Sequence, residues 1–216
     1  MNRLVLIFAV LLPVAAASAE EIALLDPSAP IEGLWSRGGW RRQTEYSRAE
    51  IGGVAAIRAV GRNSGSALHR ELRYRPADYP WLEWSWRVDK LQASAYLRDV
   101  KREDFGAAIS LLFGRPSLFR REVPTLSYVW TNAKLRPGDV VESPHHRGTV
   151  RSIVLQAGTE RLGQWVRERR NVVEDYRRAF GSDPPANVEM IAIWTDNDQT
   201  GEPVEAYYGR ISARNP

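Results

Sequence analysis

Strict alternation of apolar and polar side chains is the feature that most constrains the fold of this chain. Within residues 81–88, Leu82, Trp84, Trp86 and Val88 occupy every second position, and the positions between them are mostly polar. Alternate residues of a β-strand point to the same side. The segment therefore predicts a strand with one face buried in a core, and its aromatic content suits a central strand.

Short segments of the same kind recur along the chain and are separated by turn residues. One pair, residues 40–48 and 54–60, flanks Gly52–Gly53 and reads as a hairpin. The other expected strands are residues 67–74, 105–113, 126–130, 150–156, 164–169, 190–195 and 206–211. About ten short strands with turns between them predict a mostly all-β fold, either a β-sandwich or a jelly roll.

One short α-helix is predicted near residues 171–180. Asn171 is a suitable N-cap, and Glu174 follows it at the capping-box position. Apolar residues then recur at helical spacing, and Gly181 fits the C-terminal cap. We expect this helix to lie over an edge of the sandwich or over a barrel mouth.

The N-terminus has the order of a secretory signal peptide. Arg3 precedes the apolar run Leu4–Leu12, and Ala17–Ser18–Ala19 fits the cleavage rule for small residues. The alternative is an uncleaved anchor, but the apolar stretch is shorter than the roughly 20 residues of a membrane span. We expect a signal peptide at residues 1–19, one β-sandwich domain at residues 20–216 without a transmembrane span, and a periplasmic or secreted location.

Composition excludes several classes of function. The chain contains no cysteine, so thiol catalysis and zinc–thiolate sites are excluded. The net charge is +4, from 30 basic and 26 acidic residues that are interspersed. Because an exported protein rarely meets nucleic acid, we expect no nucleic-acid partner despite the basic isoelectric point.

Several segments occur in an order that resembles a known bacterial family. They are residues 84–88 (Trp-Ser-Trp-Arg-Val), 103–108, 126–130, 170–181, 195–201 and 207–209. Together they resemble the bacterial envelope family called domain of unknown function 3047. The resemblance implies a β-sandwich related to galactose-binding-like domains and carbohydrate-binding modules. It lends no catalytic residue, because the family has no established activity.

Asp196, Asp198 and Thr200 are the candidate metal ligands. They stand at every second position of a turn, where carboxylate and carbonyl oxygens can converge on one calcium ion. The alternative is a hairpin loop whose polar side chains cap their own backbone amides. Calcium is therefore a candidate cofactor rather than a necessary one.

Charged and aromatic residues supply the candidate ligand-binding groups. The guanidinium group of Arg170 can form bidentate hydrogen bonds with a ligand carboxylate, or it can form an ion pair with Asp104 or Asp175. Aromatic rings stack on sugar rings and also fill sandwich cores. The candidates are Asp104, Trp130, Arg170, Asp175 and Tyr208.

Three functions are compatible with these features. The favoured one is a non-catalytic module that binds a polar ligand, with a glycan as the favoured ligand class. The first alternative is a polysaccharide-active lyase or hydrolase on a jelly roll, which needs converging ionisable groups in a deep cleft. The second is an envelope interaction or assembly protein, which needs a flat apolar patch.

Overall fold

The computed structural model describes residues 20–30, 35–39, 42–115, 122–185 and 187–216. The predicted signal peptide, residues 1–19, lies outside the described residues. The part of the chain that is described contains no helix long and apolar enough to cross a bilayer.

The described residues form strands and one helix, as predicted. The strands are β1 (Glu21–Leu25), β2 (Ser36–Gly39), β3 (Glu45–Ile51), β4 (Val54–Gly61), β5 (Gly65–Tyr74), β6 (Trp81–Lys90), β7 (Phe105–Leu112), β8 (Thr125–Thr131), β9 (Val140–Glu142), β10 (Val150–Ala157), β11 (Val166–Asn171), β12 (Val188–Asp196) and β13 (Val204–Arg214); the helix is α1 (Val172–Phe180). The sequence did not predict β1, β2 or β9, which are short.

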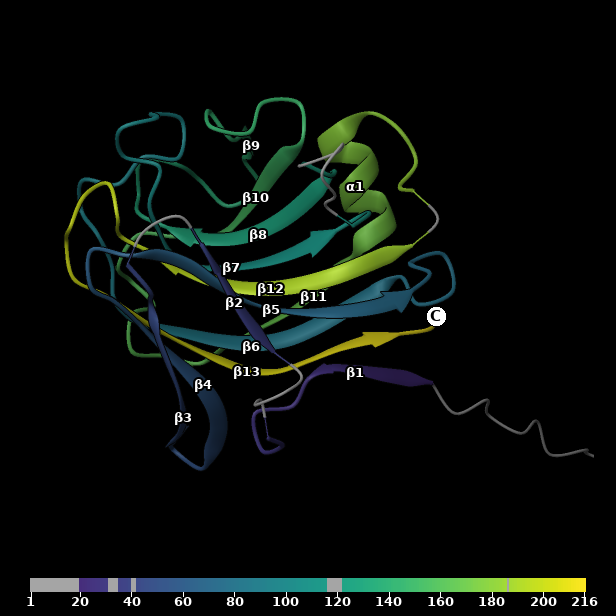
Figure 1. Cartoon of the computed structure of the whole chain (residues 1–216), viewed down its shortest axis with the longest axis horizontal. Helices are drawn as coiled ribbons and strands as arrows, with labels where there is room; N and C mark the ends of the chain where they lie inside the picture. The colour runs from purple at the N-terminus through teal and green to yellow at the C-terminus, as the bar shows by residue number, and fades with distance from the viewer. Residues whose placement is uncertain (1–19, 31–34, 40–41, 116–121, 186) are drawn as a thin grey trace, which may run out of the picture.

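The strands build two stacked sheets (Figure 1). The six-stranded sheet has the order β11-β6-β13-β4-β3, and β1 pairs with the second half of β13. The seven-stranded sheet has the order β2-β5-β12-β7-β8-β10-β9. All pairs are antiparallel except β8 and β10, which are parallel. The fold is therefore a β-sandwich with one short helix, as the alternation predicted.

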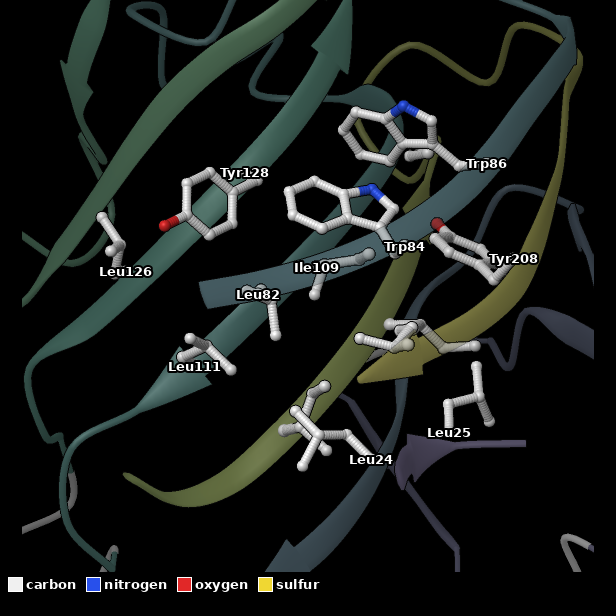
Figure 2. Close-up of a cluster of buried hydrophobic side chains, with 14 of the residues drawn as sticks. Leu24, Leu25, Leu82, Trp84, Trp86, Ile109, Leu111, Leu126, Tyr128 and Tyr208 are labelled. Atoms are coloured by element: carbon white, nitrogen blue, oxygen red, sulfur yellow. The ribbon is translucent and has the colours of Figure 1, made fainter. Parts of the chain in front are cut away.

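The core lies between the inner faces of the two sheets (Figure 2). Leu82, Trp84, Trp86 and Val88 of β6 are at most 4 % exposed, which confirms the predicted inner face. The Trp84 ring lies 5.2 Å from the ring of Tyr128 in the opposite sheet. Aromatic pairs at such distances add to the free energy of burial, so these rings help to hold the sheets together.

Helix α1 begins and ends at the predicted caps. The Asn171 side chain accepts hydrogen bonds from the amides of Val173 and Glu174, at 3.1 and 3.2 Å. Gly181 has φ +73° and donates its amide hydrogen to the Arg177 carbonyl, which ends the helix in the left-handed conformation. In Figure 1 the helix lies at one edge of the sandwich, where it contacts β10 and β11.

Residues 91–104 connect β6 to β7 without helix or strand and cover part of the outer face of the seven-stranded sheet. Leu97 packs there in a second apolar cluster. The cluster consists of Leu97, Ala108, Val129, Leu135, Val141 and Val154. This packing places Asp104, the last residue of the connection, beside the end of β12.

Candidate functional site

Three aspartates meet where β7 begins and β12 ends. We call Asp104, Asp196 and Asp198 the carboxylate cluster, because one carboxylate oxygen from each lies within 4.8 Å of the other two. Asp104 is 0 % exposed and Asp196 is 6 % exposed. The loops that carry them gather on the left in Figure 1. The structure thus joins Asp104 to two of the predicted metal ligands.

Main-chain amides hold the cluster in place. Asp104 accepts hydrogen bonds from the amides of Gln199 and Thr200, at 3.3 and 2.6 Å. Asp196 accepts one from the Asp198 amide at 3.2 Å. Gly65 makes room opposite, since a Cβ there would lie 3.1 Å from Asp196 Oδ1. Thr200, the third predicted metal ligand, therefore donates a main-chain hydrogen bond to Asp104.

Burial and like charge make full ionisation of this cluster costly. Burial raises the pKa of Asp196 well above its ordinary value, and the charges of Asp104 and Asp198 raise it further. Burial also raises the pKa of Asp104, although hydrogen bonds from Thr200 and Gln199 oppose the change. A proton or a hard cation would relieve the repulsion, and carboxylate oxygens are the ligands that calcium prefers.

A pocket of about 390 Å³ opens beside the cluster, between the β4–β5 and β12–β13 loops. We call it the end pocket. Its wall is apolar and its rim is polar and cationic. The wall includes Val60, Pro203 and Val204, and the rim includes Arg62, Asn63 and Lys90.

Close packing fixes the two loops that frame the end pocket. The Asn197 side chain accepts a hydrogen bond from the Ser64 amide at 3.0 Å and donates one to the Glu202 carbonyl at 2.9 Å. It fits because residue 61 is glycine: a Cβ at Gly61 would lie 2.5 Å from Asn197 Oδ1. Asn63 has φ +58°, a left-handed conformation that asparagine adopts more readily than most other non-glycine residues, as suits a tight turn.

Each cation of the rim already has one acidic partner. Lys90 Nζ lies 3.0 Å from Glu205 Oε2, and Arg62 Nε lies 2.6 Å from Glu45 Oε1. Burial alone would raise the pKa of Glu205, but hydrogen bonds from Tyr207, Lys90 and Arg58 outweigh it and lower that pKa to about 2. Glu205 is therefore ionised at neutral pH and forms an ion pair with Lys90.

Most predicted ligand-binding residues lie inside the fold instead of at a surface. Trp130 and Tyr208 are 1 % and 0 % exposed, and the Tyr208 hydroxyl donates a hydrogen bond to the Trp194 carbonyl at 2.6 Å. Arg170 pairs with the buried Asp175, and its Nε lies 2.8 Å from Asp175 Oδ2. Each of the four residues thus has partners within the fold, and its role in ligand binding stays a prediction.

The rim of the end pocket was not among the predicted site residues. Arg62 and Asn63 stand in a turn between two predicted strands, and Lys90 ends another strand. Turn composition at Gly61–Arg62–Asn63 marks a loop, but it does not say which distant loop will face it. Only the packing of β4 beside β13 brings residues 62 and 203 together.

Two packed sheets with one short helix at an edge define a β-sandwich protein, and its loop end carries a pocket beside buried carboxylates. Within that class, the chain belongs to the family described as "protein of unknown function (DUF3047)", whose model matches residues 35–212. Comparison with curated proteins finds no match.

Several solved structures share this architecture at low identity. The endoglucanase cel12A from Rhodothermus marinus is 12 % identical, with a TM-score of 0.48 over 91 % of this chain and 99 % of that one. A mutant of the carbohydrate-binding module CBM29-2 is 10 % identical, with a TM-score of 0.41 over 92 % and 87 % of the two chains. The xyloglucanase domain of NopAA from Sinorhizobium fredii, in complex with cellobiose, is 9 % identical, with a TM-score of 0.44 over 84 % and 93 %. These similarities concern the fold alone.

Proposed function

We propose that this protein is an exported, non-catalytic module that binds a glycan, and that the end pocket holds a sugar ring. The observation that carries the proposal is the composition of the pocket. Ligand sites combine an apolar lining with a few polar groups that fix orientation, and they usually measure about 300–1,000 Å³. The end pocket, at about 390 Å³, lies in this size range; it is open to solvent and combines apolar with polar and cationic lining residues.

Sugar chemistry suits such a lining. One side of a pyranose ring presents C–H groups, which pack on apolar side chains such as Val60 and Pro203. The ring hydroxyls need donors and acceptors, which the Asn63 amide at the rim offers. Export rests on the sequence of residues 1–19, and it would bring the domain into contact with envelope or extracellular polysaccharides.

The carboxylate cluster is the reason to weigh an enzyme as the alternative. Retaining glycosidases place two carboxyl groups about 5 Å apart on either side of the bond that they cleave. The cluster has short separations of this order, within 4.8 Å. Asp104 and Asp196 are buried, however, and Asp104 is occupied by main-chain amides. A sugar cannot enter between them in this conformation, so we favour binding without catalysis.

The second alternative, an assembly protein, has less support. It requires a contiguous apolar surface for a partner. Among the described residues, Val100 is the only large apolar side chain that is exposed, at 45 %. One isolated side chain does not form a docking patch.

A pocket-filling variant tests the proposal. The mature chain, residues 20–216, is screened on a glycan array, and its affinity for the best ligand is measured by calorimetry. Val60→Phe places a larger side chain in the wall of the end pocket and is expected to abolish binding. Val54→Phe is the matched control, because it lies on the same face of β4 but at the far end, beside the β3–β4 turn.

Both variants must first melt like the wild-type protein. If the control binds as well as wild type and Val60→Phe does not bind, the end pocket is the glycan site. Full binding by a correctly folded Val60→Phe protein would show that the sugar binds elsewhere. Silence of the wild-type protein across the array would contradict glycan binding itself.

A further inference from the structure

The charged side chains that line the end pocket are cations, although acids lie next to it: Glu205, Glu45 and the carboxylate cluster. Lys90 and Arg62 are its two charged lining residues, and both are cations. Among the described residues that line it, none is acidic. Their side chains are 59 % and 68 % exposed, so both reach solvent at the rim, where a ligand would meet them.

Both cations retain donors after their internal pairing. The Lys90 ammonium carries three N–H groups, and its one acidic partner within the described residues is Glu205. Arg62 uses Nε for Glu45, which leaves the terminal nitrogens of its guanidinium group. Arginine and lysine form their strongest hydrogen bonds with ionised oxygen acceptors.

Glu205 is already engaged by three partners. The Glu205 carboxylate is held by Arg58, Lys90 and Tyr207, with Arg58 Nε at 2.8 Å and the Tyr207 hydroxyl at 2.7 Å. A second carboxylate that approaches from solvent would meet N–H groups of Lys90 that Glu205 does not use. Asn63 and the apolar residues Val60 and Pro203 line the same pocket, which has a volume of about 390 Å³.

We infer that the end pocket selects sugars that carry a carboxylate, such as the hexuronic acid units of an acidic polysaccharide. The ring would pack against the wall formed by Val60 and Pro203, and the carboxylate would pair with Lys90 and Arg62 at the rim. This inference rests on the proposed glycan binding and adds the chemical class of the sugar.

Matched polymers separate the two proposals. Binding of the full mature protein is measured for polygalacturonate, for its methyl ester, which has the same backbone without the charge, and for neutral dextran. We expect the acid form to bind about tenfold more tightly than the ester, and we expect added salt to reduce this preference. Equal affinity for acid and ester would overturn the inference and leave glycan binding intact. Failure of the wild-type protein to bind any glycan would overturn both.

Charge variants locate the preference. Lys90→Gln and Arg62→Gln are each expected to lower affinity for the acid polymer about three- to tenfold while affinity for the ester changes little. Lys90→Arg keeps the charge and should restore most of the loss. Lys134→Gln removes an equal charge beside a different pocket and should have no effect. An equal loss with Lys134→Gln would mean nonspecific attraction of the polymer to the basic surface, which would overturn the inference.

Discussion

The hydroxyl group of Tyr128 donates a hydrogen bond of 3.0 Å to the carboxylate of Asp175, which connects the seven-stranded sheet to helix α1. The same carboxylate receives two hydrogen bonds from Arg170, at the end of β11 in the other sheet. One buried acid thus joins both sheets and the helix. Removing one member of such a buried group leaves the others without partners, which costs more than the pair contributes.

We therefore expect Arg170→Ala to destabilise the fold without abolishing glycan binding. The variant leaves the buried carboxylate of Asp175 with Tyr128 as its remaining side-chain partner, and we expect the free energy of unfolding to fall by about 3 kcal/mol. Urea unfolding measures this loss, and Arg167→Ala, on the exposed side of the same strand, is the control. Unchanged stability together with lost binding would instead assign Arg170 to the ligand.

Asp196→Asn is expected to stabilise the protein at neutral pH. Folding raises the pKa of Asp196, so the folded chain holds this proton more tightly than the unfolded chain. The free energy of unfolding of the wild type therefore falls as pH rises above the ordinary pKa of 3.8. Asparagine carries no charge, so the variant avoids the cost of ionising a buried carboxyl group. A gain of about 1 kcal/mol in the free energy of unfolding would raise the melting temperature by roughly 3 °C.

Thermal melting across a pH series checks this result. The difference between variant and wild type should grow from acid to neutral pH, and the exposed Asp78→Asn should show no such growth. A variant that melts lower than the wild type at neutral pH would show that the ionised carboxylate is needed, as it would be for a bound cation.

Calcium binding stays a prediction, and the cluster gives it a direct test. At neutral pH the ion would neutralise Asp104, Asp196 and Asp198. Calcium at about 1 mM is then expected to raise the melting temperature of the wild type and to leave Asp196→Asn unchanged. Magnesium serves as the comparison ion, because it demands a tighter and more regular geometry. Equal melting with calcium and with a chelator would contradict the prediction.

Glu205→Gln is expected to destabilise the protein at neutral pH and to have little effect in strong acid. Folding lowers the pKa of Glu205 from 4.5 to about 2. Its contribution to stability is therefore complete above pH 4.5 and is lost as pH falls towards 2. Urea unfolding at several pH values measures the difference, with the exposed Glu50→Gln as control. If the difference in free energy of unfolding between wild type and variant did not depend on pH, the variant would have lost packing contacts rather than charge interactions.

Short sequence patterns correctly predicted those strands and helix ends that depend on neighbouring residues alone. The alternation of residues 81–88 identified β6 and its inner face, and Asn171 and Gly181 fixed both ends of α1. Strands β1, β2 and β9 have three to five residues, so they contain too few alternations for a periodic pattern to appear.

The candidate site depends on contacts between distant segments, which no local pattern contains. Asp196 and Asp198 were predicted to act together because they are close in sequence. Asp104 joins them from more than 90 residues away, through the pairing of β7 with β12. Trp130 and Tyr208 were predicted as ligand-binding residues but lie in the core. An aromatic residue in a strand has the same local sequence pattern whether its ring contacts a ligand or the opposite sheet.

Strand β13 occupies the middle of the six-stranded sheet, between β6 and β4, and also pairs with β1. Its neighbours β1, β4 and β6 all precede it in the chain. Until β13 pairs, the strand edges of β1, β4 and β6 that face it stay unpaired and can associate with other chains. A chain that ends before residue 204 lacks the central strand and is expected to aggregate rather than to form a smaller version of the same domain.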